Sequence, residues 1–251
     1  MNFRRIFKSC FWLVIMLVAP QANAQWSKPQ PDTLRLDGFI GESSLSDFES
    51  LFDSNVKNVV LNSPGGFEMP AAKIADRLSA SRVKIIVDGL CVSSCANYLF
   101  VAKKRPAVRC GSVISWHGSK AHEPPSPEEL RAQGQPEDFI AKQVNWSNRL
   151  RAISAQLYSS SGVHERILYD SAQAVSGLNI KTHRTYSFNV ETGSSSVSET
   201  SSDRLWIPTA AMLRGYGFDT RDFCSSYDFD IEKALESRGI KAVYTRAPVN
   251  I

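Results

Sequence analysis

The sequence is poor in histidine, and its most apolar run, at residues 11–19, is short. Four histidines are spread over 251 residues, and no histidine cluster joins the cysteines. Structural zinc sites need four closely spaced cysteine and histidine ligands, so we expect neither a metal site nor a cofactor. Beyond the N-terminal segment, no hydrophobic run approaches the roughly 20 residues of a membrane-spanning helix. The sequence therefore predicts no membrane span in the mature chain.

The N-terminal segment predicts a cleaved signal peptide. The first ten residues are basic, and residues 11–19 are apolar but too short to span a bilayer comfortably. Small residues that a signal peptidase reads follow at Ala22 and Ala24. We therefore expect residues 1–24 to be removed and the mature protein to be periplasmic or secreted.

The net charge gives no reason to expect a nucleic-acid partner. The whole chain carries +4 at neutral pH, but the predicted signal holds Arg4, Arg5 and Lys8 and no acidic residue. Removing it leaves about +1, which provides no general attraction to phosphate. About 227 residues then remain, enough for one α/β domain with a full core.

Cysteine use agrees with export. The mature chain keeps Cys91, Cys95, Cys110 and Cys224, and an even number in an exported chain predicts disulfides. Four cysteines allow three pairings. A bond between Cys91 and Cys95 is conceivable but strained, whereas pairing with Cys110 or Cys224 closes longer loops and constrains the unfolded chain more. We expect at least one disulfide, and the spacing leaves its pairing open.

Hydrophobic periodicity predicts alternating strands and helices, typical of a mainly parallel sheet with right-handed crossovers. The predicted strands are 33–40, 56–61, 83–87 and 113–116, and the predicted helices are 45–52, 71–80, 91–102 and 137–158.

The other segments have the composition of loops and connections. Residues 25–32 are expected to form an N-terminal linker, and residues 33–251 the single domain. Residues 182–202 are rich in serine and threonine, which predicts a flexible surface insertion. Regular structure is expected to resume at residues 205–216.

Two strand ends carry residues with chemical potential. Residues 62–66 (Asn-Ser-Pro-Gly-Gly) end a strand in a turn whose glycines leave backbone N–H groups accessible to a developing oxyanion. The same turn can simply connect a strand to a helix. Ser93 and Ser94 lie between a strand and a helix, where unpaired N–H groups and the helix dipole stabilise a negative oxygen. Either serine can instead only cap the helix.

His117 completes the pattern. It follows the strand predicted at 113–116, at the carboxyl end where the sites of parallel sheets collect. A single histidine at such a position is more often structural. The order of Gly-Gly turn, helix-start serine and strand-end histidine within one α/β unit is more specific than any one part. It favours nucleophilic chemistry by a serine and a histidine.

This order resembles the proteolytic subunit of Clp protease and its relatives in the Clp protease/crotonase superfamily. Residues 62–66 are similar to the family's oxyanion turn, 93–102 to the helix that begins with the nucleophile, and 112–117 to the strand that carries the catalytic histidine. The Cys-x-Ser-Ser-Cys setting resembles an exported branch of these proteins. The resemblance implies a crotonase-like (Clp protease-like) α/β fold of repeated ββα units, with a mainly parallel sheet and a long helix after the core.

The resemblance also implies roles for single residues. Ser93 would attack a carbonyl, His117 would remove its proton, and the backbone N–H groups of Gly66 and Ser94 would form the oxyanion hole. For the acidic member, Asp203 matches the family context, between the long helix and a short apolar segment.

Two of these assignments have alternatives. Asp170 also follows the long helix and is the alternative to Asp203. Ser94 is the alternative nucleophile, because it places the small residue Ala96 two positions later. The apolar register of the following helix favours Ser93.

These features predict an exported serine hydrolase, in particular a peptidase with peptide or protein substrates. A catalytically silent scaffold that binds peptide is the alternative. A third interpretation, a crotonase-like enzyme for acyl-CoA, is disfavoured because CoA chemistry is cytoplasmic. The family commonly forms rings or stacked oligomers through the long helix, so helix 137–158 is the candidate contact of a homo-oligomer.

Overall fold

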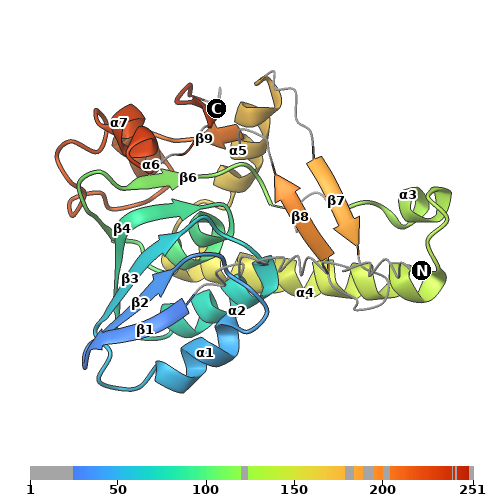
Figure 1. The fold of residues 1–251 in the computed structure, drawn as a ribbon, viewed down its shortest axis with the longest axis horizontal. Coiled ribbons are helices and arrows are strands. Elements are labelled where there is room, and N and C mark those ends of the chain that lie inside the picture. Colours follow the sequence, from blue (N-terminus) through green and yellow to red (C-terminus); the bar gives the residue numbers. More distant parts are fainter. Residues whose placement is uncertain are drawn as a thin grey trace, which may run out of the picture.

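The computed structural model describes residues 25–119, 124–178, 184–188, 195–199, 204–238, 240 and 242–248 (Figure 1). The predicted signal peptide and Asp203 lie outside these residues. The strands are β1 (Gln25–Gln30), β2 (Thr33–Asp37), β3 (Asn58–Ser63), β4 (Lys84–Val92), β5 (Ala107–Val108), β6 (Val113–Ser115), β7 (Arg184–Phe188), β8 (Ser195–Glu199), β9 (Arg204–Trp206) and β10 (Val243–Thr245). The helices are α1 (Ser44–Leu51), α2 (Glu68–Ser79), η1 (Cys95–Phe100), α3 (Pro127–Ala132), α4 (Glu137–Ser161), α5 (Arg166–Ser176), α6 (Ala210–Gly215) and α7 (Ile231–Glu236).

The main sheet has the mixed but mostly parallel pairing of an α/β fold. Its six strands follow the order β1-β2-β3-β4-β5, and β6 also pairs with β4. Only β1 is antiparallel to its neighbour within this sheet; the pairs from β2 onward are parallel. Leu36, Leu61 and Val87 align across three strands and are fully buried. The α/β prediction is therefore confirmed.

Helix α2 packs with the strands of this sheet in one hydrophobic core. Its buried positions include Ala71, Ile74, Ala75 and Leu78, the i, i+3, i+4, i+7 spacing of an amphipathic helix. It packs against both η1 and α4 (Figure 1). The helix begins at Glu68, three residues before the predicted start, because Pro70 is tolerated within a first helical turn.

Two segments differ from the prediction. Residues 25–30, expected to be linker, form strand β1, because Trp26 buries its ring against Phe48 with 5.1 Å between ring centroids. Residues 91 and 92, expected to be helical, end strand β4. Cys91 pairs with Ser63 on one side and Ile114 on the other, so sheet pairing overrides the helical periodicity there.

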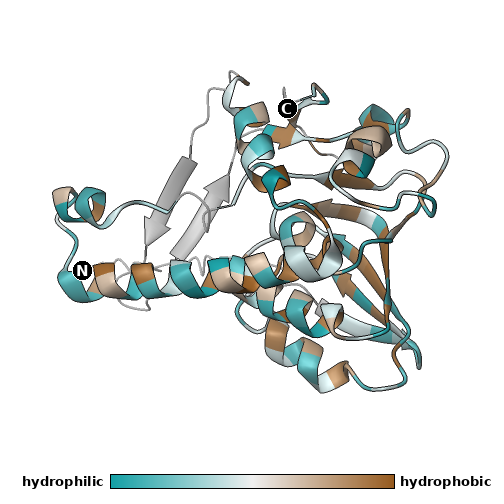
Figure 2. Ribbon diagram, turned by 180° about the vertical axis from the view of Figure 1, so that it is seen from behind, coloured by the Kyte–Doolittle hydropathy of each residue, from teal (hydrophilic) through white to brown (hydrophobic). Residues whose placement is uncertain are grey.

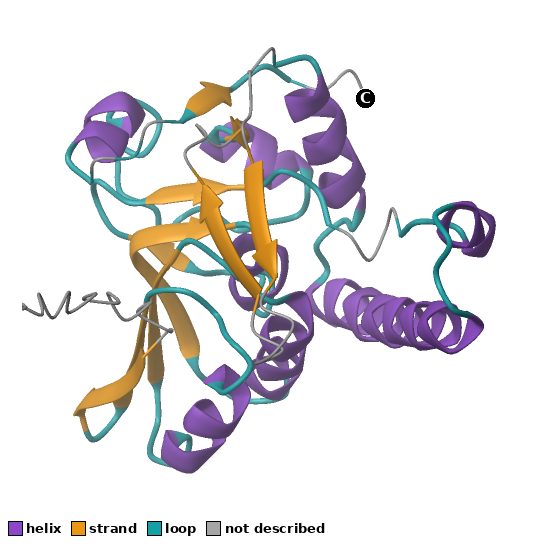
Figure 3. Cartoon of the chain, turned by 45° about the vertical axis from the view of Figure 1, so that its right-hand side comes forward, coloured by secondary structure: helices purple, strands orange, loops and turns teal. Residues whose placement is uncertain are grey.

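The insertion predicted at residues 182–202 contains regular structure in its described part. Strands β7 and β8 pair in antiparallel fashion from Arg184↔Glu199 to Phe188↔Ser195. Figure 3 shows them as a two-stranded ribbon outside the main sheet. Strand β9 resumes the domain as predicted, and it pairs in parallel with β10.

Helix α4 is the longest helix of the described chain and projects away from the sheet, with α3 near its far end (Figures 1 and 3). Leu150 and Leu157 anchor its C-terminal half in the core. Hydrophilic and hydrophobic residues alternate along its projecting half (Figure 2). No helix in the described part of the chain is long and apolar enough to cross a membrane.

Candidate active site

The loop between β4 and η1 holds Ser93 in an unusual backbone conformation. Its φ is +56°, and no other non-glycine residue in the described chain has a positive φ. This left-handed conformation is unfavourable for a residue with a Cβ. It makes a sharp turn from strand to helix, fixed by Ser93 N–H donating to the Ser115 carbonyl at 3.0 Å and Asn97 N–H donating to the Ser93 carbonyl at 2.7 Å. Ser93 is therefore held at a strained strand-to-helix turn.

The two candidate serines occupy different environments. Ser94 is 1% exposed, and its hydroxyl donates to the carbonyl of Gly66 at 2.6 Å. Ser93 is half-buried, and its hydroxyl makes no hydrogen bond with the residues that the structure describes. Ser94 thus joins the loop to the Gly-Gly turn, whereas the Ser93 hydroxyl remains available for chemistry.

The Gly-Gly turn lies directly against the serine loop. A Cβ on Gly65, whose φ is +95°, would come within 2.5 Å of the Val92 carbonyl oxygen and 2.8 Å of the Ser93 Cβ. These distances are too short for any side chain. Glycine is therefore required at position 65 both by the close approach and by the backbone conformation.

The backbone of Gly66 is oriented by its neighbours. Ile40 N–H donates to the Gly65 carbonyl, and Phe67 N–H donates to the Ile40 carbonyl, both at 2.8 Å. In such a parallel bridge, Gly66 turns its own N–H and carbonyl to the opposite side. That carbonyl accepts the Ser94 hydroxyl, so the Ser94 side chain joins the serine loop to Gly66.

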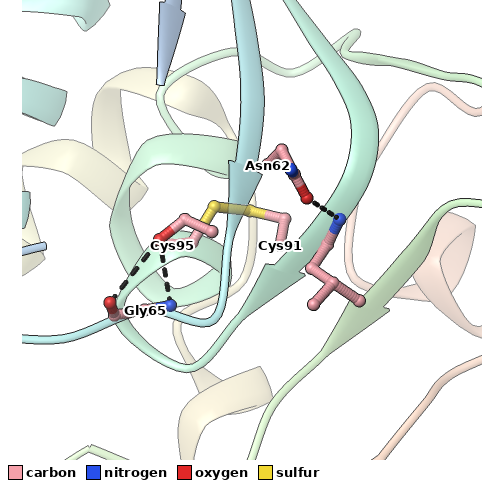
Figure 4. The surroundings of a disulfide bond; sticks show 6 residues. Asn62, Gly65, Cys91 and Cys95 are labelled. Carbon is pink, nitrogen blue, oxygen red and sulfur yellow. Dashed lines mark hydrogen bonds between the residues drawn. A yellow bond between two sulfur atoms is a disulfide. The ribbon is translucent and has the colours of Figure 1, made fainter. Parts of the chain in front are cut away.

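Asn62 holds the start of the same turn. Its side-chain nitrogen donates to Asp37 Oδ1 at 2.9 Å. Its Oδ1 accepts from the Leu90 N–H at 3.0 Å, the dashed line beside Asn62 in Figure 4. One side chain thus links β2, β3 and β4 at their carboxyl ends. Gly89 makes room for it, because a Cβ there would lie 2.2 Å from Asn62 Oδ1.

The structure contains two disulfides, and one of them joins residues on either side of the two serines. Cys91 at the end of β4 is bonded to Cys95 at the start of η1, with 5.1 Å between their Cα atoms (Figure 4). Cys110 is bonded to Cys224, 114 residues away in sequence. The prediction of at least one disulfide is confirmed, with both pairings now assigned. The first bond restricts the segment that carries Ser93.

His117 follows β6 and is exposed, while its backbone is fixed. Gly118 is bonded from both sides, since its carbonyl accepts from Asn97 Nδ2 at 2.9 Å and its N–H donates to Ser171 Oγ at 3.0 Å. Trp116 pairs with Trp206 in an antiparallel bridge, which places β9 beside the histidine strand.

Ser93, Ser94, His117 and Gly66 line one cavity of about 720 Å³. The structure therefore brings together the predicted serines, the histidine and the oxyanion turn. No hydrogen bond joins Ser93 Oγ to His117 among the described contacts. Catalytic hydrogen bonds are often long in a ligand-free site and shorten when substrate binds.

The two acidic candidates are placed differently. Asp203 lies outside the described residues. Asp170 is 3% exposed, accepts from Tyr216 Oη at 2.6 Å and pairs with Arg166 Nε at 3.2 Å. Burial and the hydrogen bond to Asp170 raise the pKa of Tyr216. The described partners of Asp170 thus belong to a structural cluster, and it does not line the cavity.

Sequence reasoning missed a second polar group in the cavity wall. Glu68 Oε1 accepts from Ser119 Oγ at 2.6 Å and from Tyr98 Oη at 3.4 Å, while Tyr98 and Ser119 lie 3.2 Å apart. Burial, and then the charge of Glu68, raise the pKa of Tyr98. Glu68 follows the Gly-Gly turn by two positions and Ser119 follows His117 by two, but neither residue is part of the predicted motifs.

No group of three metal-binding side chains occurs within the described residues. Comparison of the chain with models of protein families finds no match, and neither does comparison with curated proteins.

Proposed function

We propose that this protein is an exported serine hydrolase, in particular a peptidase, of the Clp protease/crotonase type. The observation that carries the proposal is Ser93, a non-glycine residue at φ +56° in a strand-to-helix turn, lining one cavity with His117 and Gly66. Strained backbone conformations concentrate at active sites. A sharp strand-to-helix turn that exposes a serine hydroxyl is a known way to present a nucleophile.

The proposed chemistry is acyl transfer through a covalent intermediate. Ser93 Oγ bonds to the substrate carbonyl carbon while His117 takes the hydroxyl proton, and the carbonyl π electrons move onto oxygen. The Gly66 and Ser94 N–H groups stabilise that oxyanion. Its collapse breaks the C–N bond, and His117 returns the proton to the leaving amine. Water then attacks the acyl-enzyme by the same steps and regenerates Ser93.

Two features support export. The chain begins with a segment typical of a signal peptide, and the structure contains two disulfides, which form and persist in oxidising compartments. The mature enzyme would act in the periplasm or outside the cell, without a cofactor.

One observation favours the alternative of a catalytically silent, peptide-binding scaffold. Ser93 Oγ and His117 share the cavity without a hydrogen bond among the described contacts. Reactivity toward a fluorophosphonate probe separates the two functions, because the probe modifies only an activated serine.

Three variants test the proposal. Ser93→Ala and His117→Ala are each expected to abolish labelling of the folded protein. Ser94→Ala is the matched control and is expected to retain most of it, because alanine keeps the backbone N–H and loses only the hydroxyl bonded to Gly66. Loss of labelling in Ser94→Ala alone would assign the nucleophile to Ser94. A folded wild-type protein that never labels would support the scaffold.

A further inference from the structure

The carboxylate of Glu68 is only half satisfied by the protein. Its Oε1 accepts two hydroxyl groups, while Oε2 is buried and has no hydrogen-bond donor among the described residues. A buried carboxylate oxygen without a donor costs free energy that a donor in the binding cavity would offset. The terminal torsion of a glutamate is broad, so a small rotation, which moves both oxygens together, can bring Oε2 toward the cavity that Glu68 lines.

The charges around the cavity favour a cationic ligand. Its lining contains the carboxylates of Glu42 and Glu68 and one ammonium, that of Lys73. Glu42 is exposed, whereas Glu68 is held by Tyr98 and Ser119. A carboxylate held by two hydroxyl groups is the stronger electrostatic anchor, because its side chain is already positioned at the cavity wall before a ligand arrives.

The rest of the lining fits the stem of a long side chain. Leu45, Phe67, Met69 and Trp146 provide apolar surface in the same cavity. Phe67 is 45% exposed and meets Phe39 edge-on with 5.6 Å between ring centroids. Lysine and arginine combine an apolar stem with a charged end, so they can cover this surface and still reach a carboxylate.

We propose that Glu68 is the specificity residue of this cavity and that it accepts the ammonium or guanidinium of a lysine or arginine side chain. The inference rests on the proposed function, since the side chain would belong to a peptide substrate whose scissile carbonyl lies at Ser93. The cavity selects cationic residues and disfavours acidic ones.

The test measures binding without turnover. Full-length Ser93→Ala protein is titrated calorimetrically with the tripeptide amides acetyl-Ala-Ala-Lys, acetyl-Ala-Ala-norleucine and acetyl-Ala-Ala-Glu. Norleucine keeps the stem of lysine and lacks its charge. We expect lysine to bind about tenfold or more tighter than norleucine, in the range of charged pairs at binding sites, and glutamate to bind most weakly.

The carboxylate is then neutralised. Adding Glu68→Gln, which keeps the size and one acceptor oxygen, is expected to remove the preference for lysine. Glu49→Gln, at an exposed position of α1 outside the cavity, is the matched control and should keep it. Unchanged circular dichroism shows that each variant is folded.

Other outcomes overturn the proposal. Equal binding of lysine and norleucine excludes the cationic subsite, and tighter binding of the glutamate peptide assigns recognition to Lys73. A fourth probe, the unacetylated Ala-Ala-norleucine amide, checks the chain terminus, and tighter binding of this peptide than of acetyl-Ala-Ala-Lys amide shows that the cavity binds a free amino terminus. None of these results depends on labelling of wild-type protein, so the subsite and the proposed hydrolase activity fail or stand separately.

Discussion

The strained turn at Ser93 predicts that two substitutions at this position have different effects on stability, glycine raising it and alanine leaving it nearly unchanged. In Ser93→Gly the Cβ disappears, and with it the cost of a left-handed conformation, about 1–2 kcal/mol. Glycine loses more backbone entropy on folding, which costs about 0.5–1 kcal/mol. We therefore expect Ser93→Gly to raise the free energy of unfolding by about 0.5–1 kcal/mol, which shifts Tm by about 2 °C in a chain of this size.

Ser93→Ala is the matched control for the hydroxyl. It keeps the Cβ and the strain, and the Ser93 hydroxyl has no hydrogen-bond partner among the described residues. Its stability should therefore stay within about 0.5 kcal/mol of the wild type. Both variants are expected to lose probe labelling.

Urea unfolding of the disulfide-intact proteins, followed by circular dichroism, measures both effects. The reasoning predicts that Ser93→Gly unfolds at a higher urea concentration than Ser93→Ala with the same m-value. A glycine variant less stable than the alanine variant would refute the left-handed turn at this residue.

Three further predictions concern the surrounding fold. Gly65→Ala places a Cβ 2.5 Å from a backbone oxygen of the serine loop, so urea unfolding should show a loss of about 2 kcal/mol or more, and labelling should disappear; an unaffected variant would contradict the close approach. Thiol titration of the unfolded, unreduced mature protein should find no free thiol. The double variant Cys110→Ser with Cys224→Ser should lose up to about 5 kcal/mol of unfolding free energy, because the bond closes a long loop in the unfolded chain. A loss below about 1 kcal/mol would contradict this chain-entropy argument. Burial raises the pKa of Tyr158, so the unfolded chain releases the phenolic proton at a lower pH than the folded chain. The free energy of unfolding therefore falls as pH rises above about 10, by up to about 1.4 kcal/mol per pH unit. Tyr158→Phe should flatten this fall between pH 9 and 11 in urea titrations, while Tyr169→Phe, at an exposed position, should not.

Strong local patterns predicted much of the α/β unit. The apolar run at residues 83–87 and the helical spacing of Ala71, Ile74 and Leu78 each appear where the sequence places them. These patterns are informative because apolar residues are continuous in a buried strand but recur every three or four positions in an amphipathic helix. The alternation of the elements was enough to predict a mainly parallel sheet.

Other features depend on contacts between distant residues. The helical run at 91–102 begins with two strand residues because Cys91 is paired with Ser63 and Ile114 on neighbouring strands. Periodicity within one segment carries no information on such pairing. The choice among three disulfide pairings likewise depends on which Cα atoms the fold brings within reach.

The candidate site was predictable in its residue types and not in its geometry. Motif order identified Ser93, Ser94, His117 and the Gly-Gly turn, and the structure places them around one cavity. The backbone strain that distinguishes Ser93 from Ser94 leaves no trace in a Ser-Ser dipeptide. Glu68, the first residue of α2, belongs to no motif, and its contact with Ser119 joins segments 51 residues apart in sequence.

The most direct test of the central claim is the position of the covalent adduct. Wild-type protein is treated with a fluorophosphonate, digested, and mapped by tandem mass spectrometry beside His117→Ala. The account predicts a single modified serine, Ser93, in the wild-type protein and no adduct in the histidine variant. A folded protein that carries no adduct, or one modified at another serine independently of His117, would contradict it.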